Sequence, residues 1–183
     1  MSPSAPPHLT PLEPAADTPP PGTPMPGHYA HCFACGDAEG GLQMNLTIGE
    51  GVTVTSEFTI EDRHQGAPGL AHGGVIAAAF DEALGALQVF LGEPAVTASL
   101  QTEFRRPVPT GSVLHLECRV DGREGRKLWV SGDAHLGAPD GPIVAQGKGL
   151  FVVVTPEHFS THGRPAEVEA ARGGTWFGRP VNP

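Results

Sequence analysis

The sequence predicts an α+β domain in which a curved antiparallel sheet of about six strands wraps around one central helix. Runs of alternating apolar and polar residues, which are typical of half-buried strands, lie on both sides of one long apolar segment. Short turn-rich breaks separate these runs, and such breaks favour antiparallel neighbours in one sheet. Because a lone helix that is apolar nearly all round must be hidden, we expect the sheet to enclose it.

Two strands precede the predicted helix and four follow it. Residues 42–48 and 52–60 alternate around a turn at Glu50-Gly51, which predicts a hairpin. A loop rich in glycine and proline spans residues 61–71, and the helix is expected from Gly73 to about Leu91. The later strands are expected at residues 95–104, 112–121, 127–136 and 143–154.

Both ends of the chain are expected to lie outside the domain, which we place at residues 28–154. Residues 1–27 are rich in proline, which predicts a disordered or polyproline-like tail. Residues 155–183 lose the strand pattern and predict an irregular extension with a short helix near residues 165–172. Trp176 and Phe177 in this extension are large enough to dock back on the domain.

Composition narrows the class of protein. The chain has 183 residues, a net charge of -9 and no run of lysine or arginine, which argues against partners such as nucleic acid or an anionic membrane. Asp81 and Glu82 interrupt the longest apolar stretch, which argues against a membrane span. The first residues lack the pattern of a signal peptide, and the chain has an odd count of 3 cysteines. We therefore expect a cytoplasmic protein with reduced thiols.

Four stretches carry a resemblance to a known family: CFACGDAEGGLQM, HQGAPGLAHGGVIAAAFDEALG, TASLQTEFRRPVPTG and GRKLWVSG. Across residues 32–154 the chain resembles the hotdog-fold acyl-CoA thioesterases of the 4-hydroxybenzoyl-CoA thioesterase superfamily, in the PaaI-like and THEM-like branches. The resemblance implies a hotdog fold that dimerises as a double hotdog, or as a dimer of such dimers. It also implies hydrolysis of acyl-CoA thioesters to free acid and CoA.

The two carboxylates of the helix need separate explanations, because burying an ionised carboxylate without a partner is costly. Asp81 and Glu82 point about 100 degrees apart on a helix. A structural role, either exposure to solvent or a bond to a neighbouring backbone, fits Glu82. We interpret Asp81 as the general base or nucleophile that thioester hydrolysis requires.

The glycines at the start of the helix are candidates for an oxyanion hole. Gly73 and Gly74 offer backbone N–H groups at the positive end of the helix dipole and have no side chain to block a carbonyl. Asp81 lies about 12 Å further along the helix axis, too far to reach the same carbonyl. We therefore predict a two-fold dimer in which Gly73 of one subunit faces Asp81 of the other.

Three further residues are candidates for assisting roles. His72 either caps the helix or lies beside the thioester as an orienting group. The resemblance implies that the Thr97 hydroxyl positions Asp81 or the attacking water. It also implies a side chain before the His-Gly-Gly motif that holds the water or the carbonyl. Gly66 occupies the matching position, so Gln65 beside it is the candidate.

Binding of coenzyme A requires cations for its phosphates and an apolar groove for the acyl chain. The candidate cations end or begin strands and are otherwise solvated strand ends: Arg105, Arg106, Arg126 and Lys127. The candidate groove residues are Phe80, Leu84 and Phe104.

Cys32 and Cys35 form a C-x-x-C motif that follows His28 and His31. These four residues resemble a zinc ligand set, and the cysteine pair also resembles a redox dithiol. Structural zinc usually takes ligands from two separated segments, whereas these four are adjacent in sequence. We therefore expect an ordinary loop, no metal and no cofactor. Cys118 alternates with apolar neighbours and is expected in the core.

Two other activities fit the same fold. One is a protein that binds acyl-CoA without cleaving it, and the other is a β-hydroxyacyl dehydratase that uses His72 and Asp81. The dehydratase is less favoured, because its usual signature is missing from the sequence.

Overall fold

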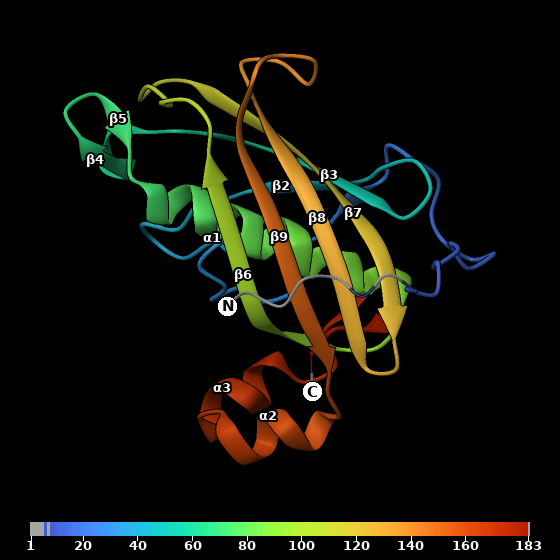
Figure 1. The fold of residues 1–183 in the computed structure, drawn as a ribbon. Coiled ribbons are helices and arrows are strands. Elements are labelled where there is room, and N and C mark those ends of the chain that lie inside the picture. Colours follow the sequence, from blue (N-terminus) through green and yellow to red (C-terminus); the bar gives the residue numbers. More distant parts are fainter. Residues whose placement is uncertain (1–5, 7, 183) are drawn as a thin grey trace.

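The computed structural model describes residue 6 and residues 8–182 of the chain. It contains an antiparallel sheet that curves around the long helix α1, Gly73–Gly85 (Figure 1). This arrangement confirms the predicted α+β hotdog fold. Because the sheet encloses the helix, one apolar core forms between them, and the side chains that α1 buries there include Ile76 and Phe80.

The main sheet has seven strands in the order β1-β2-β3-β7-β8-β9-β6. Every pairing in it is antiparallel. The strands are β1 Pro24–Met25, β2 Asn45–Ile48, β3 Thr53–Thr59, β6 Ala95–Phe104, β7 Val113–Glu124, β8 Lys127–Leu136 and β9 Ile143–Val153. The two strands predicted before the helix and the four predicted after it are therefore all present. Among the described residues, the ten-residue strand β6 forms one edge of the sheet and pairs only with β9.

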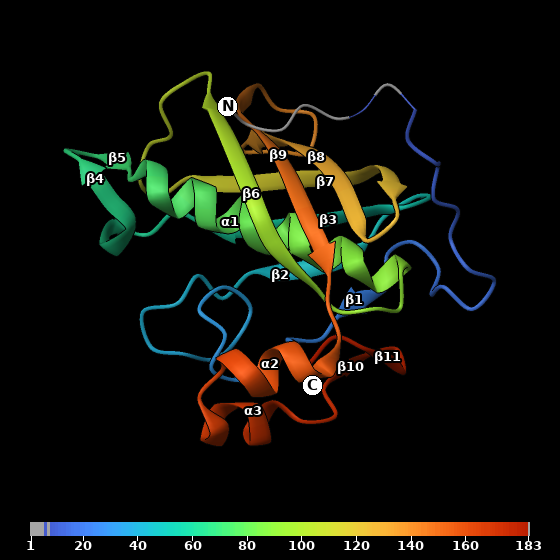
Figure 2. The ribbon, with the colours of Figure 1, turned by 60° about the horizontal axis from the view of Figure 1, so that its bottom comes forward.

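The helix ends earlier than predicted. α1 stops at Gly85, and a 3₁₀ helix, η2 Ala86–Phe90, continues the apolar segment. Residues 73–90 are long and apolar enough to cross a membrane by length and composition, yet half of this segment is buried inside the domain. The enclosing sheet therefore gives it the surroundings of a core helix (Figure 2).

Close packing of the helix against the sheet depends on a glycine. A Cβ atom on Gly147 of β9 would lie only 2.5 Å from Cδ1 of Phe80. The Phe80 side chain is completely buried. Gly147 therefore lets the aromatic ring of α1 press directly against the backbone of the central sheet.

The amino-terminal segment begins ordered structure earlier than residue 28. β1 pairs with β2, and the side chain of Met25 is buried in the core. Further back, Thr10 forms an isolated bridge with Arg123. The prediction of a disordered tail is therefore wrong for Pro24 and Met25, because these residues form β1 and the Met25 side chain is buried. Residues 1–5 and 7 of the predicted tail lie outside the described residues.

The carboxy-terminal extension is more regular than predicted. It contains α2 Pro156–His162, α3 Pro165–Ala171 and a small hairpin of β10 Thr175–Trp176 and β11 Arg179–Pro180. α3 matches the predicted short helix, whereas α2 and the hairpin were missed. The two helices pack beside the amino-terminal loop on the lower side of the domain (Figure 2).

Trp176 docks on the domain, as its size suggested. Its side chain is 1% exposed, and its indole N–H donates a 2.7 Å hydrogen bond to the backbone oxygen of Pro26. Phe177, the other candidate, remains 36% exposed.

The loop before α1 also has local structure. It contains a 3₁₀ turn, η1 Asp62–His64, and a small hairpin of β4 Gln65–Ala67 and β5 Leu70–Ala71. The amide of His72 donates to the backbone oxygen of His64. This contact fixes the point at which the chain enters α1.

Candidate functional site

Asp81 and Thr97 meet at the surface of the domain. The Thr97 hydroxyl donates a 2.8 Å hydrogen bond to Oδ1 of Asp81. Asp81 is half-buried on α1, and Thr97 is exposed on β6. The pairing of β6 with β9 shifts register between Thr97 and Ser99, and such a bulge redirects the side chains of its strand. The contact predicted from the resemblance is therefore present.

A cavity of about 310 Å³ opens beside this pair. Asp81 and Thr97 both line it, together with Phe151, the partner of Thr97 on β9. Trp176 of the carboxy-terminal extension closes another part of the wall. The cavity gives a small molecule access to the Asp81 carboxylate.

The start of α1 offers one free backbone donor. His72 is the N-cap, and its Nδ1 accepts a 2.9 Å hydrogen bond from the Gly74 amide. The capping role considered for His72 is therefore present, and the Gly74 N–H is not available to an oxyanion. Among the described residues no acceptor is recorded for the Gly73 N–H, which points out of the helix end. The ring of Phe104 lies against Gly73.

The two halves of the predicted site remain apart within one chain. Gly73 and Asp81 belong to the same continuous helix, so about 12 Å of helix axis separates them. Groups that act on one carbonyl must both lie roughly 3 Å from reacting atoms. One copy of this domain therefore cannot bring both groups to one thioester.

Gln65 takes part in the turn of the β4–β5 hairpin. Its Oε1 accepts a 2.6 Å hydrogen bond from the Gly69 amide. Beside it, a Cβ on Gly66 would lie 2.8 Å from Cα of His72, so the hairpin packs tightly against the start of α1. The Gln65 side chain thus closes the hairpin turn, and its carbonyl oxygen already has a donor.

The four candidate cations divide between the two ends of the sheet. The Arg105 amide bonds to Val144 at one end of β9, whereas Lys127 pairs with Val152 at the other. These ends lie about 26 Å apart at the usual rise per residue of a strand. A single entrance lined by all four cations is therefore absent from one chain. Arg105 also bonds to Gln146 and Glu103, Arg126 to the backbone oxygen of Val153, and Lys127 lies 3.9 Å from Glu124.

The candidate groove residues differ in exposure to solvent. Phe80 and Leu84 are completely buried in the core between α1 and the sheet. This placement does not support a role for them in an open acyl groove. Phe104 is 55% exposed at the end of β6, where an apolar ligand can reach it.

Glu82 has surroundings that the sequence interpretation missed. Its side chain is only 11% exposed and lies against the loop that carries Cys32 and Cys35. Burial raises the pKa of Glu82 to about 7. The expectation that Glu82 faces solvent or bonds to backbone is therefore wrong. A helix that is apolar nearly all round has little surface for solvent, and this signal could have indicated a partner for the second carboxylate.

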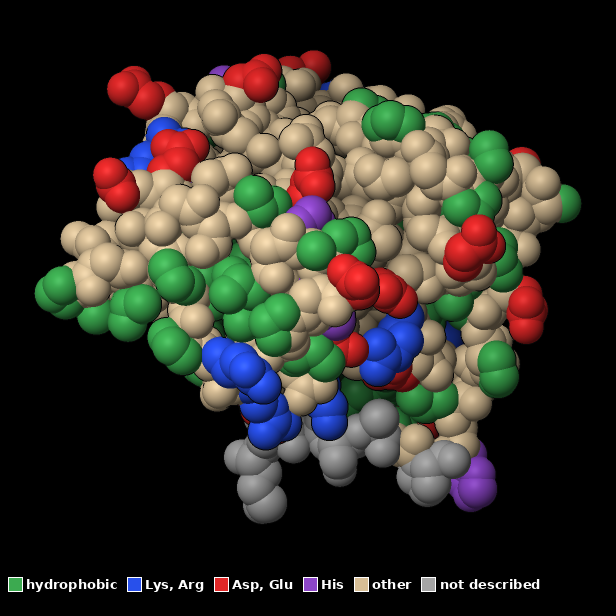
Figure 3. All heavy atoms as spheres, turned by 90° about the horizontal axis from the view of Figure 1, so that it is seen from above, with side chains coloured by type: hydrophobic (Ala, Val, Ile, Leu, Met, Phe, Trp, Pro, Cys, Tyr) green, Lys and Arg blue, Asp and Glu red, His purple; other side chains and the backbone are tan. Residues whose placement is uncertain are grey.

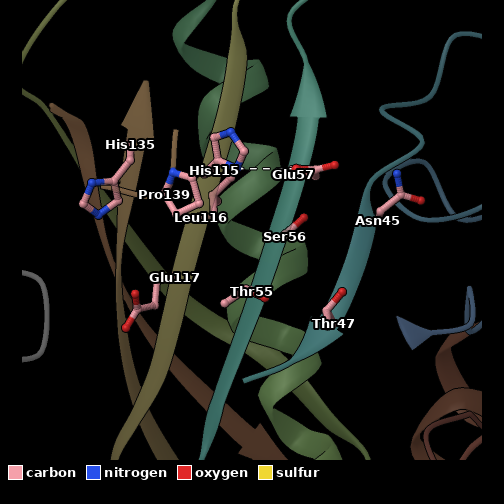
Figure 4. A pocket seen from close by; sticks show the side chains of 10 residues that line it. All are labelled: Asn45, Thr47, Thr55, Ser56, Glu57, His115, Leu116, Glu117, His135 and Pro139. Carbon is pink, nitrogen blue, oxygen red and sulfur yellow. Dashed lines mark ion pairs between the residues drawn. The ribbon is translucent and has the colours of Figure 1, made fainter. Parts of the chain in front are cut away.

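A second cavity, of about 270 Å³, lies on the outer face of the sheet, away from α1 (Figure 4). Side chains of β2, β3, β7 and β8 line it, and His115 Nδ1 lies 3.5 Å from Glu57 Oε2 at its wall. The whole sheet separates this cavity from Asp81, so it does not belong to the same site.

Charge on the surface is mixed. Seen from above, hydrophobic side chains gather on the left, the side of β4 and β5, and acidic side chains are spread over the rest (Figure 3). Lys and Arg side chains form small groups, most of them toward the lower edge of this view and one at the upper left. This face offers no broad basic surface for a nucleic acid.

Comparison with known proteins agrees with the fold. Residues 68–137, which include the start of α1, Asp81 and Thr97, match the family described as Thioesterase superfamily. Acyl-coenzyme A thioesterase THEM4 of Bos taurus is 39% identical over 97 residues, which cover 53% of this chain. The chain spans only 39% of the length of that relative.

Two solved structures show the same fold. A thioesterase superfamily protein matches with a TM-score of 0.62 and 31% identity, over 67% of this chain and 60% of its own. The E. coli PaaI protein matches with a TM-score of 0.57 and 17% identity, over 62% of this chain and 81% of its own. Residues 68–137 therefore resemble the thioesterase superfamily, and the domain built around them has the hotdog fold.

Proposed function

We propose that this protein hydrolyses acyl-CoA thioesters to free acid and CoA. The observation that carries the proposal is the hydrogen bond from Thr97 to Asp81 at the wall of an open cavity. A hydroxyl that donates to Oδ1 fixes the carboxylate and leaves Oδ2 free for water or substrate. The similarity to an acyl-coenzyme A thioesterase over 97 residues supports the same chemistry.

In this proposal Asp81 acts as general base or as nucleophile. As a base, its carboxylate takes a proton from water while the water oxygen bonds to the thioester carbon. As a nucleophile, the carboxylate oxygen forms that bond itself, and water later cleaves the anhydride. In both routes the C–S bond breaks, and the CoA thiolate leaves and takes up a proton.

The oxyanion of the tetrahedral intermediate needs a fixed donor, and the Gly73 N–H of a second subunit is our candidate. Two observations support a two-fold dimer. Gly73 and Asp81 are too far apart on one helix to share a carbonyl. The long edge strand β6 leaves one row of backbone groups without a partner in the main sheet, and a second copy of β6 could pair with it.

The same dimer explains the split of the cations. Asp81 contacts Thr97 near the start of β6, whereas Gly73 contacts Phe104 at its end. Antiparallel helices therefore place the Arg105 end of one subunit beside the Lys127 end of the other. In this arrangement cations from both subunits, Arg106 and Arg126 among them, flank each site and can bind the phosphates of CoA.

The test is a thiol-release assay with acyl-CoAs from acetyl-CoA to palmitoyl-CoA and one aromatic acyl-CoA. We expect Asp81→Asn to lower kcat by roughly 10²–10⁴-fold, the usual contribution of a general base. Asp140→Asn, which changes an exposed carboxylate in the β8–β9 loop, is the matched control and should keep full activity. Binding of acyl-CoA without thiol release by the native protein would instead identify a non-catalytic binding protein.

A further inference from the structure

The loop that follows β1 folds tightly around its two cysteines. The Gly36 amide donates to the backbone oxygen of Cys32. A Cβ on Gly36 would lie 2.4 Å from the oxygen of Ala30, so only glycine fits there. This fold turns both thiols inward, and Nδ1 of His28 lies 3.1 Å from Cys35 Sγ.

Glu82 approaches this loop from the core helix. Its Oε2 lies 3.6 Å from Cys32 Sγ, and its Oε1 lies 3.8 Å from Nδ1 of His28. One ligand atom from each of these residues lies within 4.8 Å of every other: His28, Cys32, Cys35 and Glu82. Ligand atoms around a tetrahedral zinc ion are roughly 3.3–3.8 Å apart for ordinary Zn–N, Zn–O and Zn–S bond lengths. The separations in the structure approach this geometry.

Glu82 supplies a candidate ligand from a second, separate segment of the chain. The cysteines have the C-x₂-C spacing of zinc sites, and the fourth ligand now comes from a separate element. Thiolate, imidazole and carboxylate together suit zinc better than calcium or magnesium, which take oxygen ligands.

The cluster also lacks a positive charge. Among the described residues Glu82 has an ion pair only with His28, and its Oε1 is buried without a hydrogen-bond partner. Acidic groups gathered in a half-buried space favour a divalent cation as their partner.

We propose that one Zn²⁺ binds between this loop and α1, with the ligands His28 Nδ1, Cys32 Sγ, Cys35 Sγ and a carboxylate oxygen of Glu82. Four protein ligands close the coordination sphere, so the ion has a structural role and activates no water. The proposal does not depend on the hydrolytic function.

The proposed ion connects the cysteine loop to α1, and the carboxy-terminal extension packs against one of its ligands. Trp176 of the carboxy-terminal extension packs edge-on against His28, with ring centroids 5.6 Å apart. His28 and Glu82 both line the cavity that contains Asp81. The zinc site therefore stabilises one wall of this cavity, directly beside the candidate base.

His31 is excluded from the ligand set, although the sequence suggested it. Its Nδ1 lies 3.1 Å from Oε2 of Glu167 on α3, and its side chain is 69% exposed. His28 and His31 thus form a matched pair for a test, since they lie in the same loop but only one faces the thiols.

The experiment measures metal content of the full chain after purification under reducing conditions. We expect one zinc per chain in the native protein, and tetrahedral Co²⁺ absorption with thiolate charge-transfer bands after exchange. Cys32→Ser, Cys35→Ser and His28→Ala should lose the ion, and Glu82→Gln should weaken binding roughly 10-fold or more. His31→Ala and Cys118→Ala, which change a histidine and a cysteine outside the cluster, should retain it.

A melting curve gives an independent readout. A chelator should lower the Tm of the native chain and of His31→Ala, but should leave the Tm of His28→Ala unchanged. The proposal is overturned if the native chain neither retains zinc nor shows thiolate bands with added Co²⁺. It is equally overturned if His28→Ala and His31→Ala hold zinc with the same affinity.

Discussion

Thr97 and Asp81 lie 16 residues apart in the sequence, yet the Thr97 hydroxyl donates a 2.8 Å hydrogen bond to the Asp81 carboxylate. The contact joins the edge strand β6 to the central helix α1. A β-bulge follows Thr97 in β6, and such bulges redirect the side chains of their strand. The contact needs a hydrogen-bond donor at position 97, and substitution of Thr97 can test this need.

Thr97→Val should lower kcat for thioester hydrolysis by about 10–100-fold, the equivalent of a lost hydrogen bond to a charged group. Valine keeps the shape and the strand propensity but cannot donate to Asp81. Thr97→Ser keeps the hydroxyl and should retain most of the activity. Steady-state kinetics with one acyl-CoA would measure both. Equal kcat for Thr97→Val and the native protein would contradict a positioning role.

Gly73→Pro should remove the proposed oxyanion donor with little damage to the helix. Proline is favoured at the first helical position and has no N–H, and His72 before it is already extended, with φ -68° and ψ 132°. We expect kcat to fall roughly 10²–10³-fold. Gly73→Ala keeps the N–H and is the control. Its Cβ meets only the tip of the exposed Phe104 ring at 3.1 Å.

Mixing two inactive variants tests the shared site directly. Gly73→Pro and Asp81→Asn each damage a different half of it. When equal amounts are unfolded and refolded together, about a quarter of the native sites should be restored in mixed two-fold dimers. Activity that stays at the level of the separate variants would show that each site lies within one subunit.

Trp176→Ala should destabilise the protein by roughly 3–5 kcal/mol, because a large buried side chain leaves a cavity. It also removes the hydrogen bond to Pro26 that ties the carboxy-terminal extension to the segment before β2. Phe177→Ala changes a neighbouring aromatic residue that is 36% exposed and should have a much smaller effect. Urea unfolding of both variants gives the comparison. Similar losses for the two would show that the extension does not dock through Trp176.

Gly147→Ala should destabilise the protein by about 1–3 kcal/mol through overpacking. The added methyl group would lie 2.5 Å from Phe80 Cδ1, and the ring has no space in which to retreat. The double variant with Phe80→Leu should recover part of the loss, so the two changes are not additive. Thermal unfolding of the single and double variants measures this coupling. Additive losses of stability would show that contact with Phe80 is not the reason for glycine at position 147.

The order of the elements could be predicted because each depends on local periodicity. Alternation located the hairpin before α1 and the strands from β6 to β9, and the apolar run located the helix. β1 was missed because two residues are too few for a periodic pattern, and α2 was missed as well. The position of β1 depends on the Met25 side chain, which packs into a core formed by other elements.

The candidate site was predictable in part. The motif identified Asp81, Thr97 and Gly73, and the spacing along α1 separated the two halves of the site. Sequence reasoning left open whether His72 caps the helix or lies beside the thioester, because the hydrogen bond to the Gly74 amide depends on a side-chain rotamer. It also placed Phe80 in a groove, whereas the curvature of the sheet buries it in the core.

By itself, the sequence determined the hotdog fold and the presence of two carboxylates, Asp81 and Glu82, on its central helix. Repeating local patterns contain this information, since they fix which face of each element is apolar. Only the tertiary structure decided that Glu82 meets His28 and the two cysteines, because that contact joins segments about fifty residues apart. The angle between Asp81 and Glu82 on the helix is a local property, but what each one faces depends on how the rest of the chain packs around it.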